Sequence, residues 1–403
     1  MSAATATQQQ HLLLSPAELA YLHGSLSLAP AVRADGRAAT QFRPLTAETD
    51  VLPGANGSAR VCLADGTEAV VGVKAEVGQT QQRQQQRYHD NYSYENKELR
   101  RKRKDGEQKE EEQGEEDEAE RTKKTGENEW VEITVEIPGY RDDDSSTVFL
   151  ATMLSEALLA DGEFAKKLWI NRRFHWKLYV DIILISPPLS YPLPLLSLTT
   201  HLALLATRLP RLKSEGDEDP MFDDDWAASQ FIYPRQSSAI RTSAGSRPPI
   251  TLLVMAVGDN IIFDPSKEEL AVADTALAVS VGETGVLPVD DAREEAMDVD
   301  VDEGATRTGR NLRLLSVRTI DPPSRLTAPG VPNSVNAAAW GQGEPAAKDP
   351  GARAAETDNV EGVWRAPRGG AKVSVLGAMV QKVLEKGGVA EEVLEGLEAV
   401  DLG

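Results

Sequence analysis

This 403-residue chain has few of the residues that bind metal ions: cysteine is scarce and the histidines are not clustered. Cys62 is the only cysteine, so neither a disulfide nor a cysteine-based metal site can form within the chain. A single cysteine is typical of proteins from reducing compartments. The five histidines are scattered, without the spacing that metal sites use. These shortages predict a chain that binds no metal and no cofactor.

Long apolar runs are also missing. No run approaches the ~20 apolar residues that a membrane-spanning helix needs. Leu12–Leu14 is too short to be the apolar part of a secretory signal peptide. We therefore expect a protein of the nucleus or cytosol that does not contact membranes.

Positive charge is in short supply, because the formal net charge is −21. Phosphate contacts need a basic surface, so this balance argues against a free-standing nucleic-acid binder. A subunit of a larger assembly can still face RNA through a small basic patch. The apolar fraction is 40%, slightly below the usual ~45–50% of globular chains. This deficit indicates hydrophilic insertions in an otherwise folded domain.

Breaks in the hydrophobic periodicity divide the chain into segments. Residues 1–14 read as a disordered tail, and 15–285 as one domain. An insert at 79–128, rich first in glutamine and arginine and then in glutamate, interrupts that domain. Such a segment cannot bury enough apolar surface to offset its ordering entropy. Residues 286–372 are expected to be mostly disordered, and 373–403 to form helices that pack on the domain.

Local signals predict a mixture of helices and strands. Ser15, Pro16 and Glu18 form a capping box with proline in the first turn, so a helix should begin there and end near Gly24. Asp65-Gly66 predicts a hairpin. The strands expected are 58–63, 68–77, 131–137, 174–185, 250–257, 261–263 and 275–281, and the helices are 147–160, 193–212, 373–385 and 390–400. We expect the strand at 174–185 to be buried on both faces over much of its length.

Five motifs share an order and spacing with one family: Arg33–Arg37, Asn56–Val61, Val71–Glu76, Trp176–Ile182 and Asp264–Glu269. They resemble the RNase PH-type domain of the non-catalytic ring subunits of the eukaryotic RNA exosome, and within these the ribosomal RNA-processing protein 42 type. Neighbouring subunit types share parts of the pattern. The resemblance implies an α+β fold of two βαβα-like halves, similar to ribosomal protein S5 domain 2, with long disordered insertions.

The same resemblance implies partners and a place in the cell. The partners would be other RNase PH-like ring subunits, RNA-binding cap subunits and RNA, joined in a hetero-oligomer. The work would be assembly and RNA threading in 3′-to-5′ processing and degradation, including rRNA maturation. The location would be the nucleus, with its nucleolus, and the cytoplasm.

Active members of the family hold phosphate on a glycine-rich turn after the long central strand, followed by Thr or Ser and Arg. The matching stretch here is 186–194, which contains four prolines and no arginine. Proline has no amide donor, and the next arginine is Arg208, so phosphate cannot be held in the same way. From Asp142 to Ala165 the chain also has no Lys or Arg where active relatives contact RNA. We expect no catalytic residue.

Two carboxylates leave the enzymatic alternative open. Asp264 and Asp274 bracket the region where active members place paired acids. Asp274 could be a catalytic remnant, or the two could be a turn former and a strand-edge carboxylate. The alternative function is a divergent phosphate-dependent 3′-to-5′ exoribonuclease. A third hypothesis is an interaction scaffold outside any ring.

Basic residues supply the remaining candidates. Lys74, Arg172, Arg173, Arg208 and Arg211 are candidate RNA-facing residues, although solvated surface charges have the same appearance in sequence.

Two further groups of basic residues have more than one reading. Arg33 and Arg37 flank a tight turn and could clamp a neighbouring subunit or pair with local carboxylates. The run Arg100, Arg101, Lys102, Arg103 and Lys104 suits a nuclear-import signal or a solvated charge block.

Overall fold

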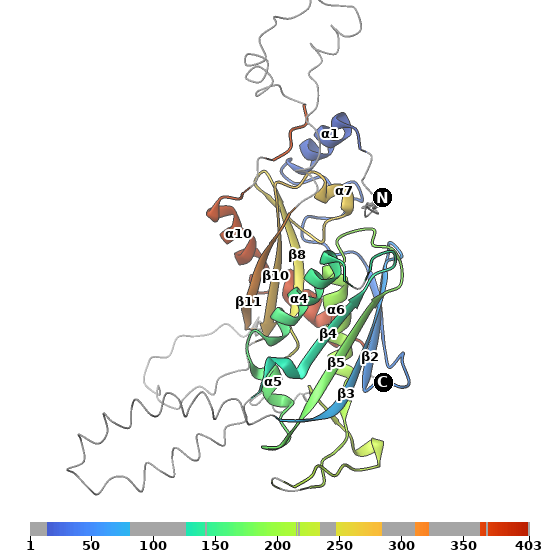
Figure 1. The fold of residues 1–403 in the computed structure, drawn as a ribbon. Coiled ribbons are helices and arrows are strands. Elements are labelled where there is room, and N and C mark those ends of the chain that lie inside the picture. Colours follow the sequence, from blue (N-terminus) through green and yellow to red (C-terminus); the bar gives the residue numbers. More distant parts are fainter. Residues whose placement is uncertain are drawn as a thin grey trace, which may run out of the picture.

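A computed structural model describes most of the predicted domain (Figure 1). The described residues are 14–80, 126–141, 143–214, 216, 218–233, 247–283, 311–321, 363–367 and 370–401. The predicted tail at 1–14, apart from its last residue, and the basic run 100–104 lie outside them.

The first half of the fold is a five-stranded sheet with the order β1-β2-β3-β5-β4. Its strands are β1 (Leu45–Thr49), β2 (Gly57–Leu63), β3 (Glu68–Gln79), β4 (Val131–Glu136) and β5 (Phe174–Leu184). All neighbours pair antiparallel except β4 and β5, which are parallel. The parallel pair requires a crossover, and α4 (Ser145–Leu159) and α5 (Glu163–Lys167) provide it.

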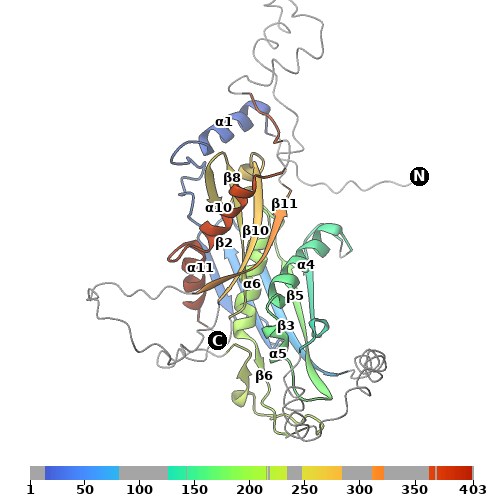
Figure 2. The ribbon, with the colours of Figure 1, turned by 90° about the vertical axis from the view of Figure 1, so that its left-hand side faces the viewer.

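The second half is a four-stranded antiparallel sheet with the order β11-β10-β8-β9. Its strands are β8 (Ile250–Val257), β9 (Asn260–Phe263), β10 (Thr275–Glu283) and β11 (Leu312–Ile320). The short α7 (Lys267–Leu270) connects β9 to β10. In Figures 1 and 2 this sheet lies beside the first, with α4 and α6 in the space between them.

The helix α6 (Leu193–Ala206) is the centre of the core, because all 14 of its residues are buried. It packs on β2, β3 and β8, so one apolar cluster joins both sheets. The closing helices α10 (Val373–Val383) and α11 (Val389–Glu398) add residues to that cluster. A second cluster lies under α1 (Pro16–Leu26). Within the described residues no helix is long and apolar enough to cross a membrane.

The local signals of the sequence correspond to real elements. Ser15 and Glu18 form the capping box of α1, which ends two residues beyond the predicted Gly24, at Leu26. The predicted hairpin is the β2–β3 pair. The α+β class with two β-containing halves is confirmed. The small β6 (Arg208–Leu209) and β7 (Gln230–Phe231), with 3₁₀ turns at Asn128–Trp130 and Trp226–Ala228, complete the described elements.

Two predictions about single elements were wrong. The helix expected at 193–212 ends at Ala206, because Thr207 is extended and the Arg208 amide donates to the Asn56 carbonyl at 2.9 Å. Proline at 210 also disfavours a continuing helix. The strand expected to be buried on both faces alternates instead, and Ile183 is 41% exposed. Within the described residues, the helices in Figure 1 lie on one face of the five-stranded sheet.

The bounds of two insertions also differ. The insert expected at 79–128 begins later, because Gln79 still pairs with Phe174 in the sheet, and Gly126 to Asn128 are described again. The strand β11 and the buried Trp364 fall within 286–372, which was expected to be mostly disordered. The strand β11 pairs with β10, but residues 284–311 separate the two in sequence. A short turn between paired strands, which would have predicted β11, is therefore missing.

Candidate functional site

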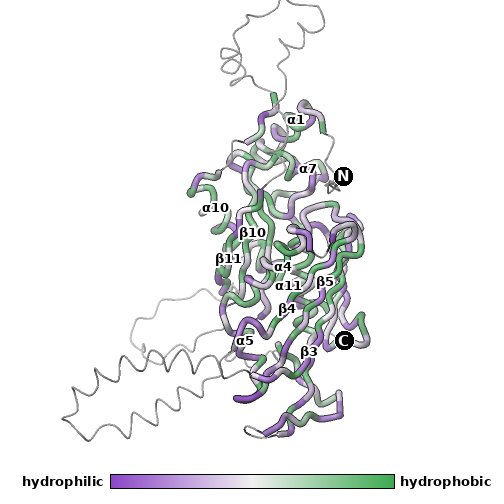
Figure 3. The backbone as a smooth tube through the Cα atoms, in the orientation of Figure 1, coloured by the Kyte–Doolittle hydropathy of each residue, from purple (hydrophilic) through white to green (hydrophobic). Residues whose placement is uncertain are grey.

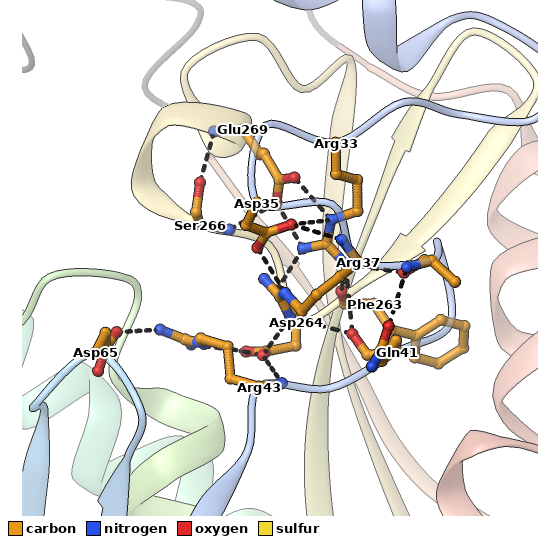
Figure 4. Close-up of polar contacts among 11 residues, drawn as sticks. Arg33, Asp35, Arg37, Gln41, Arg43, Asp65, Phe263, Asp264, Ser266 and Glu269 are labelled. Atoms are coloured by element: carbon orange, nitrogen blue, oxygen red, sulfur yellow. Dashed lines mark hydrogen bonds and ion pairs between the residues drawn. The ribbon is translucent and has the colours of Figure 1, made fainter.

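The turn at Arg33–Arg37 meets the Asp264–Glu269 motif in one polar cluster (Figure 4). Arg33 is fully buried and binds Glu269 with two hydrogen bonds, Nε to Oε1 at 2.8 Å and Nη2 to Oε2 at 2.7 Å. It also donates to the carbonyls of Phe263 at 3.1 Å and Asp264 at 3.0 Å. Charge-assisted, bidentate contacts of this kind fix geometry strongly. Arg33 therefore pairs with a carboxylate of its own chain.

Asp264 is the centre of the cluster. Its Oδ2 accepts from Arg37 Nη1 at 2.9 Å and from Arg43 Nε at 2.9 Å, and its Oδ1 accepts from Arg43 Nη2 at 2.6 Å. Burial of the carboxyl opposes ionisation, but the hydrogen bonds and charge of Arg43, followed by the charge of Arg37, outweigh it and lower the pKa of Asp264. A carboxylate that is paired with two guanidinium groups and has a lowered pKa is a weak base.

Arg43 joins the two sheets at this point. Besides Asp264, it binds Asp65 in the β2–β3 turn, with Nη1 2.5 Å from Oδ2. Figure 4 shows the Arg43 side chain reaching from the chain segment below Asp264 toward Asp65. Four carboxylates (Asp35, Asp65, Asp264 and Glu269) surround the three guanidinium groups of the cluster. The arginines are neutralised, so the cluster is a structural clasp with no spare positive charge for phosphate.

Asp274 lies apart from this clasp, just before β10. Its Oδ2 accepts from the Gly258 amide at 2.8 Å, and its Oδ1 is 3.7 Å from His23 Nε2 on α1. Burial raises the pKa of Asp274, but the interaction with His23 and the hydrogen bond from the Gly258 amide outweigh it, so the net shift is downward. Among the contacts of the described residues, none joins Asp264 to Asp274. The two acids therefore have separate sets of partners.

The stretch that matches the phosphate-binding turn leads into α6. Pro192 is the N-cap, with no side-chain capping bond, and Pro194 occupies the first turn. Leu193 is 0% and Leu195 2% exposed, so the first turn of α6 is buried. Burial raises the pKa of nearby Tyr191 to about 12. A helix N-terminus attracts anions where its amides reach the ligand, and Pro194 supplies no such amide.

Metal-binding groups near α6 or elsewhere would be a further source of chemistry. Within the described residues, no group of three His, Cys, Asp or Glu side chains could hold a metal ion. The described part of α4 presents Val148 and Phe149 to solvent, 52% and 44% exposed, and its Glu156 pairs with Arg318 of β11.

Comparison with known proteins places the chain among relatives. Residues 41–210 match the family described as "3′ exoribonuclease family, domain 1", the RNase PH family. The exosome complex component RRP42 of Saccharomyces cerevisiae is 30% identical over 273 residues, which are 66% of this chain and 81% of the relative. This chain belongs to the RNase PH family. The motif-based resemblance is thus confirmed, including the subunit type to which the motifs pointed.

Other members of the RNase PH family extend the comparison. The exosome complex component rrp42 of Schizosaccharomyces pombe is 31% identical over 290 residues, 68% of this chain and 80% of the relative. A solved structure titled "Archaeal exosome core" is similar with a TM-score of 0.44 and 19% identity, covering 75% of this chain and 84% of that chain.

The five basic candidates of this RNase PH-family chain lie on β3, in the turn before β5 and in the segment after α6. Lys74 is exposed on β3, where its Nζ donates to the Gly54 carbonyl at 3.0 Å. Arg172 and Arg173 lie in the turn before β5, and Arg173 Nη2 is 3.1 Å from Asp219 Oδ1. Arg208 lies in β6, with its guanidinium 4.4 Å from the centre of the Phe231 ring. Arg211 is exposed beside Asp223, whose amide donates to the Arg211 carbonyl at 2.8 Å.

The sequence did not mark Arg43 or Asp65 as members of the site. Arg43 stands alone before a proline, and Asp65 was assigned only as a turn residue. Arg43 binds both Asp65 and Asp264, and Asp264 comes 221 residues after Arg43. The available signal was the family motif at Asp264–Glu269, which carries three carboxylates. A carboxylate requires partners when it is buried, as Asp264 and Glu269 are.

Proposed function

We propose that this chain is a non-catalytic subunit of an RNase PH-type exosome ring. In this proposal it supports assembly and RNA threading in 3′-to-5′ RNA processing and degradation, including rRNA maturation. The support is its relation to two exosome complex components named RRP42. Its partners would be other ring subunits of the same fold, RNA-binding cap subunits and RNA. It would act in the nucleus, with its nucleolus, and in the cytoplasm.

The absence of catalysis rests on one observation, the buried entrance of α6. Leu193 and Leu195 are buried, and proline stands at 192 and 194. Phosphorolysis needs inorganic phosphate held by amides and an arginine next to the scissile bond. The first turn of α6 contains no charged residue of either sign. Asp264 is engaged in the clasp, which removes a second requirement of the enzymatic alternative.

An assay with labelled RNA and inorganic phosphate tests this proposal. The purified chain is incubated alone and within a reconstituted ring, beside an active RNase PH-type enzyme as the positive control. We expect no release of nucleoside diphosphates from the chain alone. Release that stops on Asp274→Asn would establish the divergent exoribonuclease instead.

Ring membership is tested separately from catalysis. Light scattering after size exclusion of native complexes should find the chain in a particle that contains other ring subunits. A chain that occurs only as a monomer in cell extract would support the third hypothesis, a scaffold outside any ring.

Import through residues 100–104 is tested by replacing those five basic residues and following the location of the protein.

We further propose Lys74 as the first of the five basic candidates to test for RNA contact. Lys74 donates to a neutral carbonyl, whereas Arg173 lies against Asp219, which already supplies a negative charge. Lys74→Glu in a reconstituted ring should weaken RNA binding and reduce the salt slope by about one. Arg172, Arg173, Arg208 and Arg211 are tested in the same way. An unchanged slope for all five would remove them as RNA contacts.

A further inference from the structure

An open pocket lies at the end of the molecule that is opposite α1, between α5, the start of β5 and the β6–β7 pair. Its volume is about 320 Å³, and among the described residues that line it Lys167 alone carries a charge. Figure 3 shows both hydrophobic and hydrophilic stretches at this end of the molecule, around and below α5. The other walls are mostly large and apolar: Trp169, Trp176, Leu209, Leu212, Phe222 and Phe231.

The walls are held by contacts within the chain. β6 pairs with β7, and Leu212 forms a bridge with Phe222. The Trp176 and Phe222 rings are 4.9 Å apart, which joins this wall to β5. A cavity with apolar walls and one polar group that is already in place is a common form of binding site.

The amine of Lys167 lies against an aromatic ring. Its Nζ is 3.6 Å from the centre of the Tyr233 ring. That ring is only 2% exposed and stacks on Phe164, with the two ring centres 5.9 Å apart. The contact fixes the position of the amine at the end of a flexible side chain, beside the apolar walls of the pocket.

The surroundings favour the neutral form of this amine. Burial lowers the pKa of Lys167 to about 8. The charge of Asp161 opposes this shift, that of Arg247 adds to it, and that of Glu163 opposes it. Near pH 7.5 an amine with a pKa of about 8 is neutral in roughly a quarter of the molecules, against about one in a thousand for an ordinary lysine.

The two carboxylates that oppose the shift are also bound to other cations. Asp161 Oδ2 is 3.4 Å from Arg313 Nη2 of β11. Glu163 Oε1 is 2.6 Å from the Nζ of Lys166, the residue that precedes Lys167. Their charge is therefore shared, which limits how strongly they hold Lys167 as an ammonium ion. A desolvated lysine in an apolar pocket is a recognised form of activated nucleophile.

We propose that Lys167 is an acylation site, and that its acyl donor is a thioester with an apolar acyl group of the size of phenylacetyl. The lone pair of Nζ attacks the thioester carbonyl carbon. The C–N bond forms, the C–S bond breaks, and the departing thiolate takes up the proton that the nitrogen loses. The apolar walls select the acyl group, and the volume of about 320 Å³ is enough to hold it.

The product amide carries no charge, so acylation also ends the contact between the cation and the Tyr233 ring. The site is separate from the clasp and from the α6 entrance. It does not depend on the proposed function in the ring.

The experiment treats the full chain at pH 7.5 with a limiting amount of the phenylacetyl thioester of N-acetylcysteamine. Chymotrypsin cuts after Phe164 and Trp169, so one short peptide carries both lysines, and its fragment masses distinguish them. Lys166 is the matched control, because it is the exposed neighbour of Lys167. Lys167 should be acylated at least about tenfold faster than Lys166, as expected for an activated amine.

Two variants and two further measurements complete the test. Lys167→Arg should remove most of the label from this peptide, and Lys166→Arg should leave most of it. The acylation rate at Lys167 should level off above about pH 8, whereas an ordinary lysine gains neutral amine beyond pH 9. Replacing phenylacetyl by acetyl in the thioester should slow acylation at Lys167 by at least about fivefold more than at Lys166.

Three results would overturn the proposal. They are equal acylation of the two lysines, a rate at Lys167 that rises steadily to pH 9.5, and an equal effect of the acetyl group at both positions. Circular dichroism verifies that the arginine variants fold. If either does not, the comparison of the two lysines within the native chain decides alone.

Discussion

The buried guanidinium of Arg33 touches both carboxylate oxygens of Glu269 and two backbone carbonyls of the β9–α7 connection. Glu269 in turn accepts from the Ser266 amide at 2.8 Å and completes the capping box of α7. The pair therefore ties the N-terminal arm to the second sheet. Neither partner has water as a substitute, because their side chains are 0% and 2% exposed.

Removing Arg33 alone should leave a buried charge on Glu269. We expect Arg33→Met to lower the free energy of unfolding by roughly 3–5 kcal/mol, as for other broken buried pairs. The double variant Arg33→Met/Glu269→Leu should recover part of this loss. Arg60→Met is the matched control, since Arg60 pairs with Glu68 at the surface and should cost below about 1 kcal/mol. Urea unfolding curves provide the measurement, and equal losses for Arg33→Met and Arg60→Met would contradict the prediction.

Asp264 should give the clasp a dependence on pH. Its folded pKa is lowered below the unfolded value, so its contribution is present above the unfolded pKa and is lost as pH falls through the folded pKa. Asp264→Asn removes the charge and keeps a residue that tolerates the backbone φ of 46°. The variant should be less stable than the native chain at neutral pH. The difference should shrink below about pH 4, the usual range of an aspartate.

Urea midpoints of both chains, measured from neutral to acidic pH, test this prediction. A stability difference that stays constant across the whole range would show that the Asp264 charge contributes nothing. Asp259→Asn serves as a control for an aspartate in an exposed turn.

At the scale of elements, the start of β2 and the end of α6 approach each other without room for a side chain. A Cβ atom on Gly57 would lie 2.5 Å from both the Cα and the Oγ1 of Thr207. This is the same junction at which α6 ends and the chain turns into β6. The glycine is therefore required by packing between two elements that are far apart in sequence.

Gly57→Ala should cost about 1–3 kcal/mol, the usual range for forcing extra volume into a packed site. Gly54→Ala is the control, because a Cβ there would meet nothing within 4 Å. Thermal unfolding followed by circular dichroism should show a lower midpoint for the first variant and an unchanged or slightly higher midpoint for the second. Equal midpoints for the two variants would mean that Thr207 and its neighbours move to accommodate the added methyl group at little cost in stability.

At the scale of the whole molecule, sequence reasoning succeeded where the cause is local. The capping box of Ser15 and Glu18 spans three residues, and the Asp65-Gly66 turn joins adjacent strands. Sequence reasoning did not decide whether Arg33 pairs with a neighbouring subunit or with a local carboxylate. Its partner Glu269 lies 236 residues away in the chain. The pairing of β11 and the end of α6 at Ala206 likewise depend on distant partners, which no window of sequence contains.

We propose that residues 15–285 and the closing helices form one cooperative unit. Met379, Val383, Leu394 and Leu397 belong to the same apolar cluster as α6 and both sheets. Leu394→Ala should therefore destabilise the whole chain by about 2–5 kcal/mol, as for other buried leucines. The neighbouring Glu395→Ala, at an exposed position of α11, should change stability by less than about 0.5 kcal/mol.

A single urea transition, seen alike by circular dichroism and by tryptophan fluorescence, is expected for the native chain and for Leu394→Ala, with the midpoint of the variant lowered. Ending the chain at residue 370 should remove the transition altogether, because β8 and β10 lose the cover of α10. A truncated chain that keeps the native midpoint would show that the closing helices are a separate unit. In that case Leu394→Ala would destabilise the closing helices alone and leave the two-sheet core unchanged.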